Sequence, residues 1–494
     1  MERATAAVNS QCAGCKILLP LVGMLEGQLT AATGAIENLQ KLSAEQAEKI
    51  AHLEARVNRN SNNSSQPPSA DPPGQVHPVK RRPSGLKPGG QPGHEGHHRL
   101  LAPPERVKEV IAYIPTHCEH CRHPLPPEAS PQDPPPGLHQ VTELPRVVSE
   151  ITEHQAHART CPSCGKVTRA KLPREVGNHV LGPKLAASLA YLSARGQVSR
   201  RLVQEIAVNV FDAAISTASI CKYEQELGAS LEKPYAQVRE EVLAAPAKNV
   251  DETSWQQHKN KCWLWLMATP KLAFFMIHPK RGQEGFEALV GTQPTGTLTT
   301  DRWCVYEQLS PLRHQICWPH LKRDFQKFSE CQGPARKRLG EAGLKTTGEL
   351  FAIWHAFRDG KIDRTAMCQQ LKPVRREFKK TLEDHAAGTD KKAARASRKL
   401  LKHFPALWTF ARVEGVEPSN NHAERCLRPA VMLRKRSFGN HSEAGCRFTE
   451  RLLTVGQTLR LQGRNLLTFL SEAVRAHRTG QTAPSPIPQA IESG

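Results

Sequence analysis

The sequence predicts an α/β protein with a mixed β-sheet that is interrupted by an all-helical insertion. Between Lys248 and Tyr306, short runs rich in Trp, Phe, Ile, Thr and Met alternate with turn residues, which is typical of consecutive strands. Residues 330–410 instead show helical periodicity and contain 18 Lys or Arg against 9 acidic residues. We expect the core to resume near Glu417.

The strand-rich stretch predicts where two carboxylates of the core lie. We expect strands at 249–255, 261–269, 272–278, around 296–301 and at 314–320, with a short helix over 282–291 and another over 321–329. This succession of strands and helices is similar to that of a ribonuclease-H-like sheet, in which Asp251 and Asp301 are neighbours. Two carboxylates on adjacent strands suit a divalent cation. The alternative is that each Asp only caps a turn.

Composition indicates the partner and the compartment. The 494 residues leave room for two to four domains, and a net charge of +21 with a pI near 9.6 favours a polyanion such as double-stranded DNA. A basic protein without such a partner is the alternative. We find no apolar window long enough for a membrane span and no leader peptide, which predicts a cytoplasmic protein without a membrane partner. Six of the 14 cysteines fall in Cys-x-x-Cys pairs, which favours zinc in a reducing compartment.

The N-terminal region predicts a coiled coil over 16–58, followed by a disordered basic linker over 59–105. Ten positions spaced by four and three residues carry eight apolar side chains, with Ile36, Ile50 and Val57 at one heptad position. This arrangement favours a homodimer or higher oligomer. Gly and polar residues weaken the pattern, and an amphipathic helix docked on its own domain is the alternative. We assign no metal to the isolated pair Cys12 and Cys15.

Two further modules precede the core. Over 106–172 we expect a zinc-binding domain whose structural Zn²⁺ is held by Cys118, Cys121, Cys161 and Cys164, with a strand at 147–154 between the two pairs. A redox pair or unligated thiols are the alternatives. Over 180–245, apolar residues at helical spacing and Ser capping signals predict a helical segment that resembles a helix-turn-helix DNA-binding element. Helical hairpins that never touch DNA show the same pattern.

A third carboxylate follows the insertion. Glu424 lies among basic residues that could hold phosphates: Arg425, Arg428, Arg434, Lys435 and Arg436. A carboxylate in such a setting can hold a metal ion against a phosphodiester. The alternative is a capping box, because Asn421 precedes Glu424 by three residues. The core would then span 246–460 with its insertion at 330–410, and 461–494 would form a C-terminal helix and tail.

Taken in order, these motifs resemble the insertion sequence sixty-six family of bacterial transposases, in its large catalytic subunit. The resemblance covers the zipper-like arm, Ser-Ser-Gln-Pro-Pro-Ser at 64–69, Lys-Pro-Gly-Gly-Gln-Pro-Gly-His at 87–94 and the paired cysteines. It continues through Asp-Glu-Thr at 251–253, Thr-Asp at 300–301, Cys-Trp-Pro-His at 317–320 and Asn-Asn-His-Ala-Glu-Arg at 420–425. Arg302 and Phe438 depart from the family's commoner residues but leave the three carboxylates in place.

The resemblance implies a DDE-type catalytic core with Asp251, Asp301 and Glu424 as catalytic residues and as ligands of two Mg²⁺ (or Mn²⁺) ions. His320 and Asn421 are candidate accessory residues. Glu252 would point to the opposite face of its strand from Asp251. Gly343 opens a stretch that looks like a phosphate loop but lacks a glycine before the lysine, so we expect no nucleotide triphosphate.

The expected function is therefore transposition of DNA in the bacterial nucleoid, by metal-dependent cleavage at the ends of an insertion sequence and strand transfer into target DNA. The family also suggests small accessory proteins of the same element. One alternative is a zinc-containing, sequence-specific DNA-binding regulator without catalysis. Another is a ribonuclease-H-like nuclease that cuts DNA without joining it.

Overall fold

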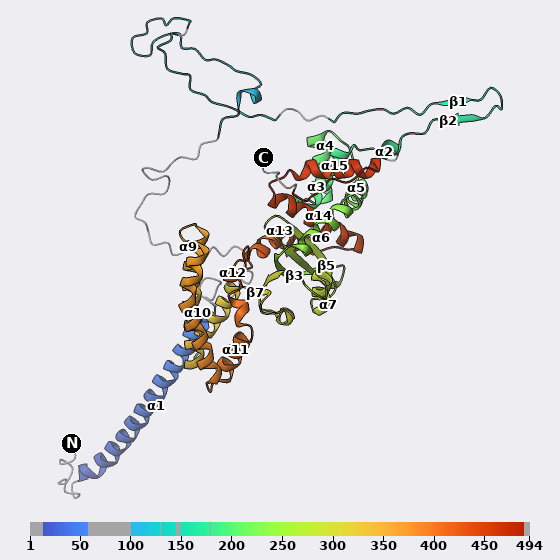
Figure 1. The fold of residues 1–494 in the computed structure, drawn as a ribbon. Coiled ribbons are helices and arrows are strands. Elements are labelled where there is room, and N and C mark those ends of the chain that lie inside the picture. Colours follow the sequence, from blue (N-terminus) through green and yellow to red (C-terminus); the bar gives the residue numbers. More distant parts are fainter. Residues whose placement is uncertain (1–12, 58–99, 129, 145–148, 178, 489–494) are drawn as a thin grey trace. The chain divides into compact units, whose positions relative to one another are not determined.

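The computed structural model describes residues 13–57, 100–128, 130–144, 149–177 and 179–488 (Figure 1). Most of the predicted linker and Cys12 lie outside these residues. The chain divides into two compact units: Met1–Val76 with Leu231–Leu466 and Ser485–Gly494, and His77–Ser230 with Leu467–Pro484. Each unit is considered by itself. Within the described ranges, none of the helices combines the length and the apolar character that crossing a bilayer requires.

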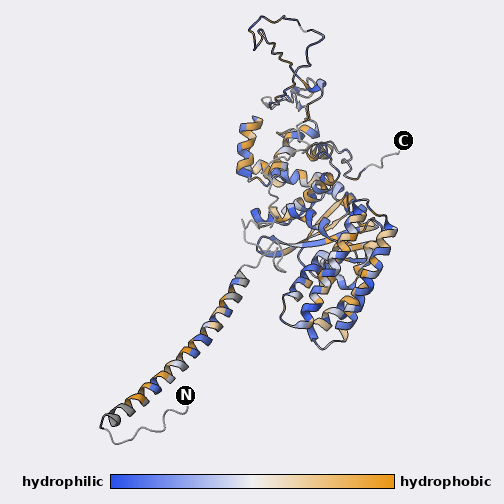
Figure 2. Ribbon diagram, turned by 90° about the vertical axis from the view of Figure 1, so that its left-hand side faces the viewer, coloured by the Kyte–Doolittle hydropathy of each residue, from blue (hydrophilic) through white to orange (hydrophobic). Residues whose placement is uncertain are grey.

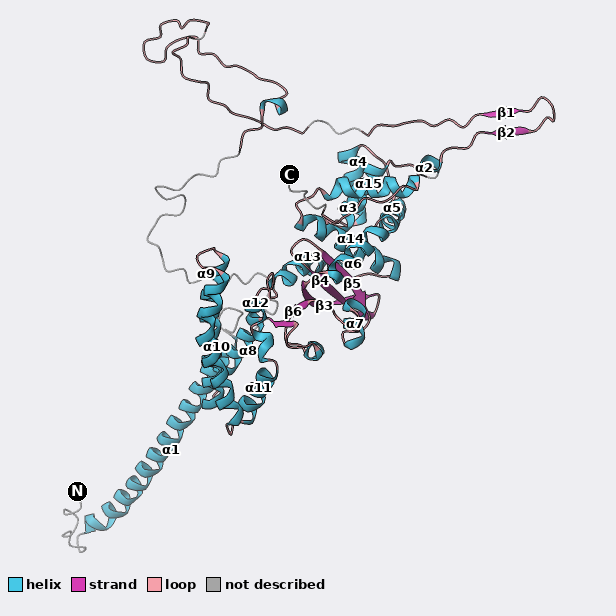
Figure 3. Cartoon of the chain, viewed as in Figure 1, coloured by secondary structure: helices cyan, strands magenta, loops and turns pink. Residues whose placement is uncertain are grey.

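The first unit contains a five-stranded mixed sheet in the order β5-β4-β3-β6-β7 (Figure 3). Its strands are β3 (Ala247–Gln257), β4 (Asn260–Ala268), β5 (Ala273–His278), β6 (Thr297–Thr300) and β7 (His314–Ile316). Strands β3, β4 and β5 form an antiparallel meander, and β6 and β7 add to β3 in parallel. The predicted mixed sheet and the adjacency of the strands that lead to Asp251 and Asp301 are confirmed.

The fifth strand is shorter than predicted. It ends at Ile316, and Trp318 already begins the helix α8 (Trp318–Ser329), so Trp318, Pro319 and His320 are helical and not extended. Pro319 explains the early start, because proline has the backbone φ of a first helical turn and no N–H to satisfy there. The short predicted helix is present as α7 (Gln283–Val290), and a 3-10 helix, η3 (Cys304–Gln308), joins β6 to β7.

Helices cover both faces of this sheet. Along β4, Leu264, Leu266 and Ala268 pack against α13 (Asn421–Ser437) and α14 (Glu443–Leu461), whereas Trp265 and Met267 pack against α6 (Glu232–Ala244) and α7. The two sets alternate because successive side chains of a strand point to opposite faces. Burial on both faces explains why β4 is apolar from Cys262 to Ala268 instead of alternating with polar residues.

The predicted helical insertion is confirmed. It contains α9 (Pro334–Arg358), α10 (Arg364–Ala387), α11 (Lys391–Lys402), η4 (Phe404–Leu407) and α12 (Thr409–Arg412). Its core is shared with α8 and includes Trp318, Phe325, Phe378 and Trp408. Gly343, at the start of the stretch compared with a phosphate loop, lies inside α9, where an added Cβ would meet the Phe325 ring at 2.3 Å.

The second unit contains three helices of the predicted helical segment: α3 (Pro183–Ala194), α4 (Arg200–Phe211) and α5 (Thr217–Ser230). The Ser199 side chain caps α4 by accepting from the Leu202 N–H, as its sequence signal predicted. Most of α15 (Leu466–Thr479) belongs to this unit, where Arg478 donates two hydrogen bonds to the Glu226 carboxylate. Whether α4 and α5 read DNA stays a prediction.

The strand expected at 147–154 is absent from its described part, 149–154. The hairpin lies further along the chain, where β1 (Ala158–Thr160) pairs antiparallel with β2 (Val167–Arg169) and closes the turn that holds the second cysteine pair. A four-residue helix, α2 (Arg174–Gly177), follows. The prediction was wrong because apolar alternation alone does not supply the partner strand that a ladder needs.

The N-terminal region is one helix, α1 (Ala13–Val57), 45 residues long. Its predicted seam side chains are exposed, among them Leu25, Leu29, Ile36, Leu39, Ile50 and Leu53. Figure 2 shows apolar and hydrophilic segments alternating along this helix. An exposed seam of this kind needs a second helix to cover it. The coiled coil with another copy stays a prediction.

Candidate active site

Strand register brings the two aspartates together. Asn249 of β3 pairs with Thr299 of β6 in parallel, and Asp251 and Asp301 each come two residues after this pair. Asp251 continues β3, while Asp301 follows the end of β6, where its Oδ1 accepts a hydrogen bond from the Trp303 N–H at 2.9 Å. The sheet therefore places two carboxylates side by side at the point where β6 ends.

Glu424 approaches from the helix that covers one face of the sheet. Val250 packs toward α6 and α7, so its neighbour Asp251 points to the face covered by α13, in which Glu424 lies in the first turn. The helix cap Asn420 fixes this approach: its Nδ2 donates to the Val250 carbonyl and its Oδ1 accepts from Asn249 Nδ2, both at 2.9 Å.

The capping-box alternative for Glu424 does not hold. Helix α13 is capped by Asn420, one residue earlier than a box with Glu424 requires, and the cap makes no side-chain hydrogen bond to the helix. Asn421, the predicted accessory residue, is exposed in the first turn of α13, whereas Asn420 is fully buried. The positioning contacts belong to Asn420.

Electrostatics show that the three carboxylates are close enough to repel one another. Burial raises the pKa of Asp251 well above its usual value, and the charges of Glu252, Asp301 and Glu424 raise it further. Burial also raises the pKa of Asp301 and of Glu424, and the Asp301 charge adds to the shift of Glu424. A site that disfavours its own negative charge in this way is suited to a cation.

The donor set fits a hard divalent cation that keeps other ligands. All three groups supply oxygen, and the mutual repulsion just described would be relieved by a positive charge between them. Over the described ranges, however, no group of three or more His, Cys, Asp or Glu side chains stands in an arrangement that could hold a metal ion. Magnesium is usually held by one or two protein carboxylates, with water and substrate phosphate oxygens completing its ligands.

His320 faces Glu424 from α8. Its Nε2 lies 3.8 Å from Glu424 Oε1, and its Nδ1 lies 3.2 Å from the Cys317 sulfur, which also accepts from the Asn420 N–H. Burial lowers the pKa of His320 to about 4, and Arg323 contributes to the shift, so the ring is neutral near pH 7. Cys317 keeps its proton, because burial raises its pKa to about 12. The ring therefore lies beside Glu424 without carrying a charge that would neutralise it.

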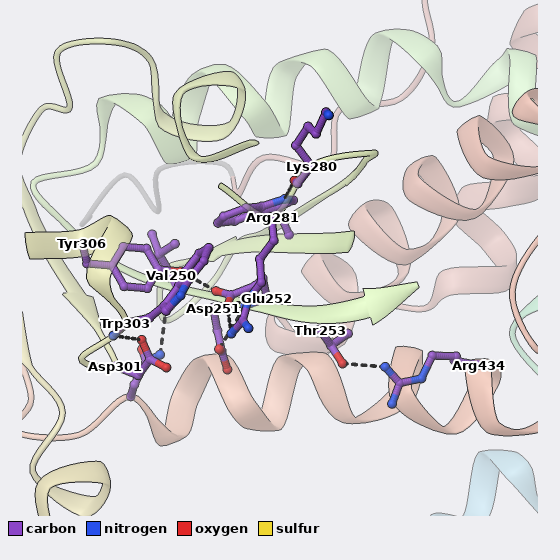
Figure 4. Close-up of polar contacts among 12 residues, drawn as sticks. Val250, Asp251, Glu252, Thr253, Lys280, Arg281, Asp301, Trp303, Tyr306 and Arg434 are labelled. Carbon is purple, nitrogen blue, oxygen red and sulfur yellow. Dashed lines mark hydrogen bonds and ion pairs between the residues drawn. The ribbon is translucent and has the colours of Figure 1, made fainter. Parts of the chain in front are cut away.

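On the opposite face of β3, Glu252 anchors the loop that follows Asp301 (Figure 4). Its side chain is 2% exposed, and its carboxylate accepts two hydrogen bonds from Arg281 and one from the Tyr306 hydroxyl. The Arg281 guanidinium stacks on both Trp263 and Trp303, at 4.7 and 4.2 Å from the ring centres. This orientation agrees with the prediction that Glu252 points away from Asp251, and it holds the backbone next to Asp301.

The predicted basic residues of α13 divide into two groups. Arg434 donates to the Thr253 hydroxyl and to Ser254, so it ties α13 to β3 (Figure 4). The other four are exposed, and they are Arg425, Arg428, Lys435 and Arg436.

Arg323 of α8 is a site residue that sequence patterns did not predict. Its charge lowers the pKa of Asp301, Glu424 and His320. The sequence signal that could have identified Arg323 is its spacing of three residues from His320, which places both residues on one face of a helix.

The two cysteine pairs form the same local turn. In each, the first cysteine N–H donates to the carbonyl five residues later, and the N–H four residues later donates back to the first cysteine. Each turn contains one residue with a left-handed backbone conformation, Arg122 in the first and Gly165 in the second. Backbone N–H groups lower the pKa of Cys118 and of Cys161, as thiolate ligands require. In the described part of this unit, however, the two pairs do not converge on one metal group.

Comparison with known proteins points to a family. A family profile described as "Transposase IS66 family" matches residues 179–447, which include all three carboxylates. A second, "Family of unknown function (DUF6444)", matches residues 25–100.

Three curated relatives from Sinorhizobium fredii (strain NBRC 101917 / NGR234) are named as uncharacterized proteins. The chain is 22% identical to y4hP over 372 residues, covering 67% of this chain and 66% of the relative. It is 23% identical to y4qI over 335 residues, covering 58% and 61%. For y4jD the identity is 23% over 259 residues, covering 49% and 48%. The match thus spans less than two thirds of each relative's own length.

Proposed function

Because this chain belongs to the IS66 family of transposases, we propose that it is a DDE-type polynucleotidyl transferase that cuts the ends of an insertion sequence and joins them to target DNA. The observation that carries the proposal is that two neighbouring strands and a covering helix carry Asp251, Asp301 and Glu424 on one side of the sheet, where the charges of Asp301 and Glu424 raise the pKa of Asp251. The strand order, with an antiparallel meander extended by parallel strands, supports a ribonuclease-H-like core for this chemistry.

In the proposed mechanism, the chain's residues hold the metal ions and the DNA in line. Asp251, Asp301 and Glu424 would be the carboxylates that hold two Mg²⁺ or Mn²⁺ ions. When bound, such ions lower the pKa of an attacking water or DNA 3′-hydroxyl and stabilise the leaving oxygen. Glu252, Arg281 and Tyr306 hold the Asp301 loop, and His320, which contacts Cys317, lies beside Glu424.

The proposed substrate is double-stranded DNA. Arg425 and Arg428 lie one and four residues after Glu424 and are exposed, so they can bind phosphates next to the carboxylates. The net charge of +21 supports the same partner. A homodimer or higher oligomer through α1, and small accessory proteins of the same element, are part of this proposal.

We also propose that Cys118, Cys121, Cys161 and Cys164 hold a structural Zn²⁺. The matching hydrogen-bond pattern of the two turns and the lowered thiol pKa values support it. Zinc binding would bring the two turns together and order a segment with little core of its own. Zinc analysis of the purified chain would test this: about one equivalent should be lost when Cys118 and Cys161 are both changed to Ser.

The decisive experiment replaces Asp301 with Asn. This change preserves side-chain size and the acceptor for the Trp303 N–H but removes a charged ligand, so magnesium-dependent cleavage of element ends should fall by about a thousandfold or more. DNA affinity measured without magnesium should stay within about twofold. Retained cleavage would reject the catalytic assignment.

The products separate the alternative functions. A DNA-binding regulator would bind element ends without any metal-dependent cleavage by the unchanged protein. A nuclease would cut without producing joined strands. Strand-transfer products from the unchanged protein, and none from the Asp301→Asn variant, would support the transposase over both.

A further inference from the structure

Helix α11 of the insertion carries a row of unbalanced positive charge. Its twelve residues contain no acidic side chain, and Ala393, Ala394, Ser397 and Leu400 form its buried face. All six basic residues of the helix are exposed, and they are Lys391, Lys392, Arg395, Arg398, Lys399 and Lys402. From Lys391 to Lys402 the row runs about 16 Å along the helix axis.

This row works against the stability of its own helix. Three like-charged pairs stand four residues apart, Lys391 with Arg395, Arg395 with Lys399, and Arg398 with Lys402. Each such pair destabilises a helix, and Lys391 and Lys392 also lie in the first turn, at the positive end of the helix dipole.

Neighbouring helices show the balanced alternative. In α9, Lys345 pairs with Glu349 and also with Glu377 of α10, and in α10 Lys379 pairs with Glu383. In α11, Lys399 pairs with Glu307, and Arg398 donates to the Ala386 carbonyl. In the part of the chain that the structure describes, the other four basic side chains of α11 make no ion pair or side-chain hydrogen bond.

The C-terminal end of the row lies beside the loop of the active site. Glu307, the partner of Lys399, lies in η3, six residues after Asp301. Lys399 and His403 also line, with Arg302 and Trp303, a small cavity beside that loop. The α11 face and the segment next to Asp301 are therefore one continuous part of the first unit.

We propose that the exposed face of α11 binds the phosphate backbone of duplex DNA and extends the DNA contact from the active site along the helical insertion. Phosphates supply the negative charge that this face lacks, and Lys and Arg at one-turn spacing contact a backbone without reading its sequence. The inference builds on the proposed function, but it concerns binding alone and does not require the carboxylates to catalyse.

The test replaces Lys391, Lys392, Arg395 and Lys402 together with Gln, which keeps helix propensity. Affinity of the full-length chain for a short random-sequence duplex is measured over a range of salt concentrations in the presence of a chelator. If all four residues contact phosphates, the slope of log affinity against log salt should fall by about 3.6, or 0.9 for each contact.

A matched control removes the same charge from the same insertion. Lys345, Arg358, Lys361 and Lys379 are exposed, and three of them pair with nearby carboxylates. Their replacement by Gln should change the slope by less than about 1. Circular dichroism checks that both variants fold. If the fourfold variant does not fold, an Arg395→Gln, Lys402→Gln double variant takes its place, and its slope of log affinity against log salt should fall by about 1.8.

Equal slopes for the α11 variant and the control would overturn the proposal, because net charge alone would then account for any loss of affinity. An unchanged slope in the α11 variant would overturn it as well. Since no cleavage is measured, a catalytically inactive chain would give the same slopes, and the Asp301→Asn experiment remains a separate test.

Discussion

At the scale of single residues, Asn420 connects the helix that carries Glu424 to the strand that carries Asp251. Its buried amide makes two hydrogen bonds to β3, and its backbone N–H donates to the Cys317 sulfur. These contacts fix where α13 begins, and hence where Glu424 lies relative to the aspartates. The next residue, Asn421, is exposed.

The two asparagines make a matched pair for mutation. Asn420→Ala leaves the Val250 carbonyl and the Asn249 amide without partners, so the free energy of unfolding should fall by about 1–3 kcal/mol. Magnesium-dependent cleavage should fall by about 10–100-fold as Glu424 loses its position. Asn421→Ala should change stability by less than about 0.5 kcal/mol. Equal effects at both positions would contradict the role of Asn420.

The buried carboxyl of Glu450 in α14 should make the free energy of unfolding depend on pH. Its side chain is 1% exposed, accepts from the Ile277 N–H and pairs with Arg447 at 3.0 Å. Burial raises its pKa to about 7, above its usual 4.5. Between these values the folded chain binds the proton and the unfolded chain does not, so this carboxyl lowers stability as pH rises from about 4.5 to about 7.

Glu450→Gln removes that titration and keeps an acceptor for the Ile277 N–H. Above pH 7 the variant should be more stable than the unchanged chain by up to about 3 kcal/mol, and the advantage should shrink toward about pH 5. Denaturant unfolding of both proteins at the two pH values measures the difference. Glu443→Gln, an exposed change on the same helix, is the control. A pH-independent difference would contradict the assignment to Glu450.

At the scale of elements, the crossing of α8 and α9 depends on glycine. Added Cβ atoms would meet the Phe325 ring at 2.3 Å from Gly343 and the Ser329 nitrogen at 2.3 Å from Gly340. The two helices can therefore approach closely only where α9 lacks side chains. Gly348, in the same helix, has no atom within 4 Å of a Cβ position.

The same substitution should have opposite effects at two positions of α9. Gly343→Ala forces the buried Phe325 ring to move and should destabilise the chain by about 1–3 kcal/mol. Gly348→Ala meets open space and should stabilise it by about 0.5–1 kcal/mol, because alanine loses less backbone entropy in a helix. Thermal unfolding of both variants gives the comparison. Shifts of the same sign would mean that the close approach does not constrain the crossing.

At the scale of the whole molecule, α1 leaves its apolar seam uncovered, which predicts self-association. Leu39→Asp together with Leu53→Asp would bury charges in a two-helix seam and should weaken the association by about a hundredfold or more. Asn38→Asp with Gln40→Asp adds the same charge off the seam and should leave it intact. Sedimentation velocity distinguishes the two. A chain that is monomeric before mutation would reject the prediction.

Sequence patterns located most elements because they depend on local physics. The strand runs around Asp251, the short helix after Gly282 and the helical insertion are as predicted, since composition and turn residues govern them. Two strand predictions were wrong. In its described part, 149–154, the strand expected at 147–154 has no partner strand, and the strand expected to reach residue 320 ends at Ile316 because a helix with Pro319 in its first turn begins there. Asn420 and Arg323 were missed because their roles depend on contacts with distant residues.

The sequence by itself determined the three carboxylates, the basic charge, the order of strands and the family resemblance, because residue identity and near-neighbour spacing carry all of these. Only the tertiary structure decided that Asp251 and Asp301 lie level with each other and that Glu424 shares their face. The tertiary structure also shows that Arg434 connects α13 to β3 and that the basic side chains of α11 lie on its exposed face. These depend on register and packing between segments far apart in the chain, which local pattern does not specify.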